Sequence, residues 1–295
     1  MPNDRMNYIG ASDFPAIMGM SPYKSPLQLW AEKTGQLEPD DLSDNQAVEW
    51  GTRLERIVSQ KFSDDHEVKL IARKTRYVHP EHSFISCELD NIIAGTDELV
   101  EIKTVNAWAW KQWSDPDELP AHVIVQVMVQ LGLSKRKIGW VACLCGGQKY
   151  IEKKIEFDQK FYDIIIASGV TFWKMVVDRT PPIAMGMDNK DVVLRLNPSH
   201  TDEVEEANDM NDRIRYLQEV KMHIENLIKE KDDLEAIIKE RIGGKLGIVT
   251  DIYSVTWKSQ KRRSVDTVAL KVDMLYDRYS KETETRVLRI TNAKK

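Results

Sequence analysis

The sequence is short of several features that mark specialised classes of protein. Its three cysteines, Cys87, Cys143 and Cys145, are too few for a disulfide framework and are not spaced as zinc ligands. The same number excludes a four-cysteine iron–sulfur cluster. No stretch approaches the roughly 20 apolar residues of a membrane span, and the first residues lack the basic and apolar segments of a secretory signal. We therefore expect a cytoplasmic protein with reduced cysteines and no membrane contact.

Positive charge is also scarce, because the formal net charge is −5 at pH 7. Residues 258–295 nevertheless carry eleven Lys and Arg and five Asp and Glu, a net charge of +6 that leaves −11 for the other residues. An acidic body with a local basic segment suits a protein that binds and releases nucleic acid, although a basic tail is equally often only solvated surface. The length of 295 residues and the 42% hydrophobic content predict one catalytic domain with an appendage.

Hydrophobic periodicity and turn residues predict that helices and strands both occur along the chain, as in an α/β (α+β) fold. Residues 10–34 are expected to form short helices, with Ser25-Pro26 as a helix start, and residues 46–64 repeat apolar side chains at helical spacing. Gly146-Gly147 predicts a hairpin. The further predicted elements are strands at 67–78, 83–89, 91–94, 98–105, 138–145 and 148–156, and helices at 121–133 and 158–177.

The double proline Pro181-Pro182 predicts a domain boundary, so residues 1–182 are interpreted as the catalytic domain and residues 183–199 as a linker. Apolar residues then recur at a spacing near 3.5, which predicts a long helical, coiled-coil-like arm over residues 200–243. Gly243-Gly244 ends this arm. The basic region 244–295 is expected to contain short strands at 248–258 and 285–291.

Two carboxylates and a lysine stand out in the β-rich stretch, within Glu88-Leu89-Asp90 and Glu101-Ile102-Lys103. Residues two apart on a strand project to the same face, so Glu101 and Lys103 are expected side by side. Carboxylates are ligands that Mg²⁺ prefers, and hydrolysis of a phosphodiester uses such cations to neutralise the phosphate and to deliver hydroxide. Alternating charges also occur on the solvated face of an ordinary antiparallel strand, so this pattern alone leaves both interpretations open.

Further motifs appear in a fixed order around this pair. With them, the chain resembles the phage lambda exonuclease / YqaJ-type viral recombinase family, within the PD-(D/E)xK restriction-endonuclease-like class, over roughly residues 5–178. The residues that carry the resemblance are Arg5, Ile9-Gly10-Ala11-Ser12-Asp13, Trp50-Gly51-x-x-Leu54-Glu55, His79-Pro80-Glu81, Leu89-Asp90, Glu101-Ile102-Lys103 and Gln126 to Gln130.

The resemblance implies a core in which helices flank a mixed central sheet. It also implies a centre with two Mg²⁺ ions, for which Mn²⁺ can substitute. It assigns metal binding to Asp90, Glu101, the carbonyl of Ile102 and Glu55, the last directly or through a metal-bound water. Lys103 would orient the attacking water and stabilise the transition state, and Gln126 would contact that lysine or water. From the residues alone, Glu55 could instead be an exposed partner of an arginine, and Gln126 a surface amide.

Arg5 and Ser12 have the spacing that the family uses for a pocket that grips a terminal 5′-phosphate. A guanidinium binds phosphate oxygens in a bidentate manner, and a hydroxyl at a helix start adds a donor. The alternatives are that Ser12 is a plain N-cap and that Arg5 is a frayed terminal charge.

Three positions depart from the family pattern. Asn91 stands where glycine is usual, and we expect asparagine to tolerate the left-handed turn that glycine serves. Met128 stands where a second glutamine is usual, and His122 where a tyrosine is usual. The surroundings of Lys103 are therefore expected to differ from the family pattern.

Trp108, Trp110 and Trp113 follow the catalytic strand closely. Aromatic rings beside such a site can stack on unpaired bases and help to open a duplex end, although tryptophans also cluster as core or interface packing.

The resemblance implies a Mg²⁺-dependent exonuclease that degrades the 5′-ended strand at duplex DNA ends and leaves 3′ overhangs for recombination. It also implies a homo-oligomer, such as a trimeric ring, and a single-strand annealing protein as partner. Two alternatives stay open: a structure- or sequence-specific endonuclease on the same core, and a non-catalytic DNA-binding or assembly subunit.

Overall fold

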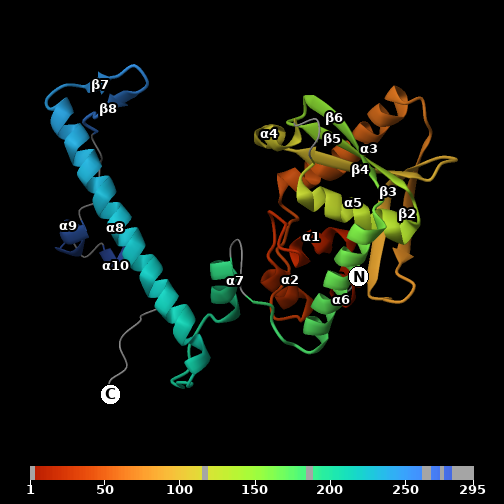
Figure 1. The fold of residues 1–295 in the computed structure, drawn as a ribbon, viewed down its shortest axis with the longest axis horizontal. Coiled ribbons are helices and arrows are strands. Elements are labelled where there is room, and N and C mark those ends of the chain that lie inside the picture. Colours follow the sequence, from red (N-terminus) through yellow and green to blue (C-terminus); the bar gives the residue numbers. More distant parts are fainter. Residues whose placement is uncertain (1–3, 115–118, 184–188, 261–266, 273–275, 281–295) are drawn as a thin grey trace. The chain divides into compact units, whose positions relative to one another are not determined.

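The structure is a computed structural model that describes residues 4–114, 119–183, 189–260, 267–272 and 276–280. It divides into two compact units, Met1–Pro198 and Ser199–Lys295, which are described separately (Figure 1). None of the described helices combines the length and apolar character needed to cross a bilayer.

The first unit is built on a six-stranded mixed sheet with the order β1-β3-β4-β5-β6, in which β2 pairs with the other edge of β3. Its strands are β1 (Ile9–Gly10), β2 (Leu70–Val78), β3 (Ile85–Ile93), β4 (Glu98–Val105), β5 (Ile138–Cys145) and β6 (Lys149–Glu156). The β1–β3 and β4–β5 pairs are parallel, and the β2–β3, β3–β4 and β5–β6 pairs are antiparallel. The predicted mixed central sheet is confirmed.

The strand β3 carries two partners on one edge. β1 pairs with Ile85 and Ser86 near the start of β3, whereas β4 pairs with Asn91 and Ile92 near its end. Because β2 occupies the opposite edge throughout, β1 and β4 must share the remaining one. A gap in backbone pairing therefore lies between them, and Asp90 lies at its border.

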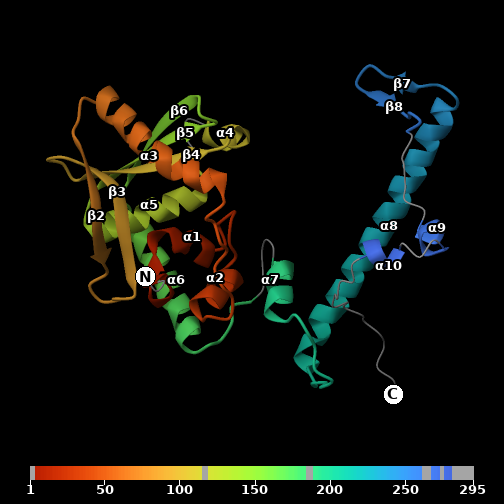
Figure 2. The ribbon, with the colours of Figure 1, turned by 180° about the vertical axis from the view of Figure 1, so that it is seen from behind.

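Helices cover both faces of the sheet (Figures 1 and 2). The helix α3 (Gln46–Asp65) buries Val58 and Phe62 against Val100 and Ile102 of β4 on one face. The other face carries the main core, formed with α1 (Phe14–Ile17), α2 (Pro26–Lys33), α5 (Ala121–Ser134) and α6 (Gln159–Val177).

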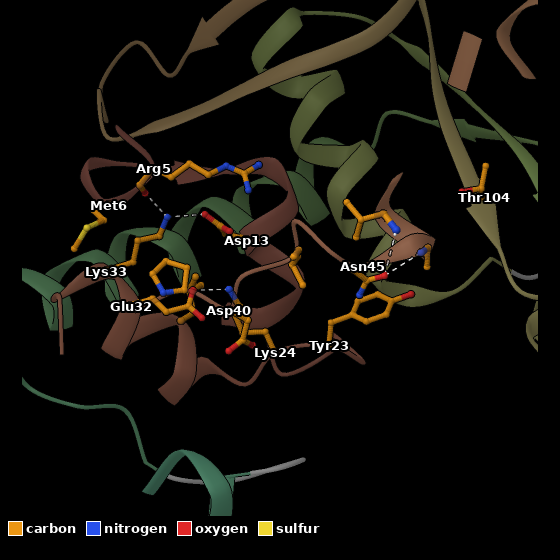
Figure 3. Close-up of a pocket in the computed structure, with 15 residues that line it drawn as sticks. Arg5, Met6, Asp13, Tyr23, Lys24, Glu32, Lys33, Asp40, Asn45 and Thr104 are labelled. Atoms are coloured by element: carbon orange, nitrogen blue, oxygen red, sulfur yellow. Dashed lines mark hydrogen bonds and ion pairs between the residues drawn. The ribbon is translucent and has the colours of Figure 1, made fainter. Parts of the chain in front are cut away.

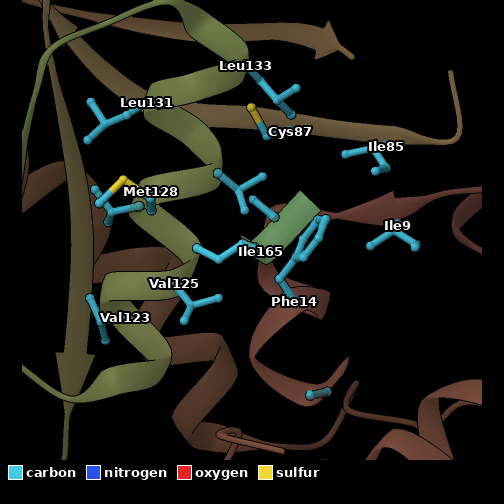
Figure 4. Packing of buried hydrophobic residues seen from close by; sticks show 14 of the residues in the cluster. Ile9, Phe14, Ile85, Cys87, Val123, Val125, Met128, Leu131, Leu133 and Ile165 are labelled. Atoms are coloured by element: carbon cyan, nitrogen blue, oxygen red, sulfur yellow. The ribbon is translucent and has the colours of Figure 1, made fainter. Parts of the chain in front are cut away.

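Figure 4 shows α5 at the centre of this main core, with Val123, Val125 and Leu131 among the side chains that it buries. Phe14 and Ile165 join it from α1 and α6. A side chain at Gly169 would collide with the ring of Phe14, so glycine permits the close approach of α6 to α1. The apolar run of α5 is thus explained by burial on nearly every side.

Most predicted elements of the first unit are confirmed, with three differences. The strands expected at 83–89 and 91–94 are one strand, β3. The short β1, the 3-10 helix η1 (Asp4–Asn7) and α4 (Trp110–Trp113) were not predicted. Residues 183–199 are not a plain linker, because they contain α7 (Asn189–Leu196), where Arg195 Nη1 lies 3.2 Å from Asp40 Oδ1. The remaining short helices are η2 (Ala11–Asp13) and η3 (Ala107–Ala109).

The second unit contains the long helix α8 (Asn211–Ile242) and a hairpin of β7 (Gly247–Val249) and β8 (Ser254–Thr256). The predicted arm is confirmed, but its regular helix begins at Asn211, after η4 (Asn208–Met210), rather than at residue 200. The strand expected at 248–258 is two strands joined by a turn. The short helices α9 (Thr267–Val272) and α10 (Tyr276–Tyr279) follow, and the strand expected at 285–291 lies outside the described residues.

Candidate functional site

Asp90 is the extra residue of a β-bulge in β3. In the register with β2, Asn91 pairs with Ala72 and Leu89 pairs with Arg73, so Asp90 has no residue opposite. A bulge re-aims the side chain that it carries, and bulges are frequent beside active sites. The Asp90 Oδ2 atom accepts a hydrogen bond of 2.8 Å from the backbone N–H of Ile102. The carboxylate thereby replaces a backbone partner where β3 and β4 separate.

Glu101 is held by three side chains on the face of the sheet that α5 covers. Its Oε1 accepts hydrogen bonds from Lys103 Nζ at 2.6 Å and from Gln126 Nε2 at 2.6 Å. Its Oε2 accepts one from Gln130 Nε2 at 2.7 Å. Gln126 and Gln130 are four residues apart on α5, so they share one face of that helix. The Glu101 carboxylate is therefore fixed by donors on both of its oxygens.

Lys103 lies between Glu101 and Gln126, whose Oε1 accepts a second hydrogen bond of 3.0 Å from its ammonium. The predicted contact between Gln126 and the lysine is confirmed. Burial lowers the pKa of Lys103, but the carboxylates of Glu101 and Asp90 raise it more, so that the net shift is upward. The lysine is consequently a fixed cation. Burial and the lysine together lower the pKa of the neighbouring His122.

The nearby carboxylate of Glu101 affects the pKa of Asp90. Burial, reinforced by the charge of Glu101, raises the pKa of Asp90 to about 8. A bound divalent cation would remove this penalty, because it stabilises both carboxylates in their charged form. The donor set is made of hard oxygens, which fits Mg²⁺ or Mn²⁺.

Glu55 is placed differently from Asp90 and Glu101. Its side chain is exposed on α3, and its negative charge also raises the pKa of Asp90. Within the described residues, no three acidic, histidine or cysteine side chains converge on one point where they could hold an ion. The structure therefore brings together a pair of carboxylates, and a role for Glu55 as a metal ligand, directly or through water, stays a prediction.

Asn91 does not adopt the left-handed conformation that we expected for it. It is absent from the residues with positive φ and lies buried within β3. Its Nδ2 donates a hydrogen bond of 2.9 Å to Ser59 Oγ, and that hydroxyl donates one of 2.8 Å to the carbonyl of Glu55. Asparagine at this position thus links the strand beside Asp90 to the turn of α3 that carries Glu55.

Arg5 and Ser12 line one cleft of about 400 Å³ together with Asp90, Gln126 and Gln130. The pairing of β1 with β3 explains this proximity, because η2, which carries Ser12, directly follows β1. Ser12 lies inside η2, whose N-cap residue is Gly10, so the N-cap alternative is wrong. Arg5 belongs to η1, and its carbonyl accepts a hydrogen bond of 2.6 Å from Lys33 Nζ, so it is not frayed.

Comparison with known proteins places this site in a family. Residues 2–137 match the YqaJ-like viral recombinase domain. Over 293 residues the chain is 31% identical to the uncharacterised protein YqaJ of Bacillus subtilis (strain 168). The alignment covers 96% of this chain and 91% of YqaJ. The chain belongs to the YqaJ-like viral recombinase family.

Solved structures show the same fold for the nuclease-like unit of this YqaJ family member. The alkaline exonuclease LHK-Exo from Laribacter hongkongensis superimposes with a TM-score of 0.51 at 18% identity, covering 59% of this chain and 90% of that one. Its complex with dAMP gives a TM-score of 0.50 with the same coverage and identity. The predicted α/β nuclease-type core is confirmed as a fold.

A larger cavity of about 780 Å³ adjoins the cleft of this YqaJ-like domain and shares Arg5 with it (Figure 3). Figure 3 shows Lys33 between the backbone of Arg5 and the carboxylate of Asp13, which is 2.9 Å from its Nζ. Lys33 also donates a hydrogen bond of 2.7 Å to the carbonyl of Tyr8. This buried lysine, which we did not predict, anchors the N-terminal segment that carries Arg5.

The three tryptophans of the YqaJ-like domain have different surroundings. Trp113 is only 2% exposed and packs in the main core, so the prediction that it stacks on bases is wrong. The ring of Trp110 is half-buried, with Lys149 Nζ 4.0 Å from its centroid. Trp108 is 92% exposed and remains available for stacking.

Two further residues of this YqaJ-like site were not predicted as functional. Gln130 is 2% exposed and clamps Glu101, and its repetition four residues after Gln126 was the available signal. Arg76 lines the same cleft as Arg5, with its guanidinium 3.7 Å from the centroid of the Tyr8 ring. No sequence motif indicated Arg76, because it reaches the cleft only through the pairing of β2 with β3.

Proposed function

We propose that the protein is a Mg²⁺-dependent exonuclease that enters at the ends of double-stranded DNA and degrades the 5′-ended strand. The observation that carries this proposal is the single cleft in which the bulged Asp90 meets Arg5 and Ser12. A metal-binding carboxylate and an anion-binding group are thereby next to each other. The fold shared with an alkaline exonuclease, one structure of which contains dAMP, supports the proposal.

In this mechanism Asp90, Glu101 and the carbonyl of Ile102 would hold the metal, and Glu55 would contribute directly or through a metal-bound water. Bound Mg²⁺ supplies charge neutralisation on the scissile phosphate and a hydroxide equivalent from its water. Lys103 places a fixed positive charge beside Glu101, where it stabilises the extra negative charge of the phosphorane-like transition state. Gln126 and Gln130 keep Glu101 in one orientation, so that little reorganisation accompanies the reaction.

The direction of digestion follows from the phosphate-binding side of the cleft. A terminal 5′-phosphate bound by the Arg5 guanidinium and the Ser12 hydroxyl would place the next phosphodiester near Asp90. Arg76 supplies a second cation at the same cleft. An internal phosphodiester carries less negative charge than a terminal monoester, so the cationic cleft favours ends. Trp108 would stack on a base of the separated strand.

The product would be duplex DNA with 3′ single-stranded overhangs, suited to recombination by strand annealing. We propose a single-strand annealing protein as the partner that receives these overhangs. A homo-oligomer such as a trimeric ring would keep the enzyme on DNA by encircling it.

The decisive experiment follows linear duplex DNA labelled separately at each strand terminus, with Mg²⁺, for wild type, Asp90→Ala and Lys103→Ala. Wild type should release mononucleotides from 5′ ends first, and both variants should lose activity by at least about a thousandfold. Covalently closed circular duplex should resist cleavage. Cleavage of closed circles as fast as of linear DNA would refute exonuclease action.

The phosphate side of the cleft has a separate test. Arg5→Ala should abolish the preference for 5′-phosphorylated over 5′-hydroxyl ends, a loss of about tenfold or more. Lys174→Ala, which removes an exposed cation from α6, is the matched control and should keep the preference. An unchanged preference in Arg5→Ala would remove Arg5 from the phosphate pocket.

A further inference from the structure

The hairpin of the second unit frames a cleft of about 690 Å³ at the end of α8. The residues that line it are Gly243, Gly244, Lys245, Leu246, Trp257, Lys258 and Ser259. Gly243, at φ 56°, turns the chain out of the helix, and Trp257 N donates a hydrogen bond of 3.0 Å to Leu246 O. A side chain at Gly247 would collide with the carbonyl of Val255 in the facing strand. These glycines therefore create the turn that gathers the tryptophan and the lysines.

Two exposed aromatic rings belong to one side of this hairpin. Tyr253 and Trp257 flank β8 four residues apart, and backbone hydrogen bonds with Thr250 and Leu246 continue the hairpin pairing to both of them. Residues separated by an even number on an extended strand project to the same side. Trp257 is 52% exposed and Tyr253 is 68% exposed. Val255, between them, is half-buried on the same side. The hairpin thus presents a row of apolar side chains with a ring at each end.

Two lysines line the same cleft as Trp257. Neither Lys245 nor Lys258 has a carboxylate partner among the described residues. In the sequence from residue 243 to residue 260, Asp251 is the sole acidic residue. This contrasts with the chain as a whole, whose net charge is −5. A ring beside cations that have no carboxylate partner in the described part of the chain is complementary to a polyanion that has exposed flat bases, rather than to a neutral apolar protein surface.

We propose that this surface, formed by Lys245, Tyr253, Trp257 and Lys258, binds single-stranded DNA. The bases would stack on Trp257 and Tyr253, and the two ammonium groups would contact phosphates. If the proposed exonuclease function holds, the ligand is the 3′-ended strand that digestion exposes. A duplex would not suit the surface, because its bases are already stacked on one another.

The test measures binding of a fluorescent dT oligonucleotide to full-length protein by anisotropy, in EDTA and in an Asp90→Asn background so that no cleavage occurs. Trp257→Ala should weaken binding by about tenfold, and Trp257→Phe should retain most of the affinity because a ring remains. Tyr216→Ala, which removes another exposed ring from α8, is the matched control and should bind like the parent. Thermal unfolding of each variant verifies that the second unit is intact.

The lysines give an independent readout through salt dependence. Lys245→Gln with Lys258→Gln should lower the slope of log affinity against log salt by about 1.4, since each phosphate contact contributes about 0.7 for a single strand. Lys221→Gln with Lys229→Gln, from the exposed surface of α8, should leave the slope unchanged. Photocrosslinking with a thiothymidine-containing oligonucleotide should label residues 245–258.

Several outcomes would overturn the inference. Unchanged affinity in Trp257→Ala, or crosslinks confined to residues before 199, would show that the strand binds elsewhere. Self-association that Trp257→Ala abolishes, without an effect on DNA affinity, would show that a second copy covers the surface. Nuclease assays of the wild type on short linear duplex are separate. Failure of the parent protein to bind the oligonucleotide, with intact digestion by the wild type, would refute this inference alone. Oligonucleotide binding without digestion would refute the proposed function alone.

Discussion

Replacing Asp90 by asparagine should stabilise the metal-free protein at alkaline pH while it abolishes cleavage. The change is nearly isosteric, and the amide oxygen can still accept the hydrogen bond from Ile102 N–H, which is 2.8 Å in wild type. It removes a carboxylate whose pKa burial and the charge of Glu101 raise from 3.8 to about 8. The variant therefore separates the electrostatic cost of the site from its packing.

Proton binding to Asp90 determines whether the stability of the folded state rises or falls with pH. Between pH 4 and 8 the folded state keeps the Asp90 proton, whereas the unfolded chain releases it, so wild-type stability falls as pH rises through this window. Each unit of pKa shift corresponds to about 1.4 kcal/mol, which sets an upper limit of about 6 kcal/mol. Because water reaches the half-buried side chain through the cleft, we expect about 2 kcal/mol, or roughly 4–8 °C in Tm.

The assay is thermal unfolding by circular dichroism in EDTA between pH 4 and pH 9. The difference in Tm between Asp90→Asn and wild type should grow with pH and level off above pH 8, because groups remote from Asp90 titrate equally in both proteins. Asp97→Asn removes one exposed carboxylate from the turn before β4 and serves as the control for surface charge. Adding Mg²⁺ at pH 9 should stabilise wild type only. A difference that does not change with pH would refute the reasoning.

Three further predictions concern the same unit. Because Mg²⁺ competes with the proton on Asp90, the Mg²⁺ concentration for half-maximal cleavage should rise by up to tenfold per pH unit below pH 8; a requirement independent of pH would contradict the raised pKa. Gln130→Leu removes the hydrogen-bond donor to Glu101 Oε2 and should lower kcat at saturating Mg²⁺ by about tenfold or more. Gln130→Glu, which places a carboxylate at the same position, is the control. A normal kcat in Gln130→Leu would show that this hydrogen bond is dispensable. Trp113→Ala should lose about 3–5 kcal/mol of stability, whereas Trp108→Ala should lose less than about 0.5 kcal/mol, as measured by urea unfolding; equal losses would contradict the burial of Trp113.

Much of the chemistry was predictable from local sequence. Strand alternation by itself brings Glu101 and Lys103 to one side, and the structure places the ammonium 2.6 Å from the carboxylate. Helical periodicity likewise predicted α3, since it repeats apolar residues on the face that it buries. The heptad-like spacing of α8 was predictable for the same reason, although the start of that helix was not.

Other properties depend on pairings between distant segments. The bulge at Asp90 exists only in the register of β3 with β2, which no local pattern encodes. Gln130 donates a hydrogen bond to Glu101 only because α5 packs across that face of the sheet. Trp108 and Trp113 differ in exposure because the short helices that carry them place the ring of Trp113 in the core and leave the ring of Trp108 in solvent.

The carboxylates, the lysine and their order along the chain were thus determined by the sequence alone, because strand and helix periods act over a few residues. The tertiary structure decided that Arg5 and Ser12 share a cleft with Asp90, since this requires β1 to occupy the edge of β3 that β4 leaves free. A contact between residues 85 positions apart depends on strand order, and strand order is set by the packing of the whole sheet.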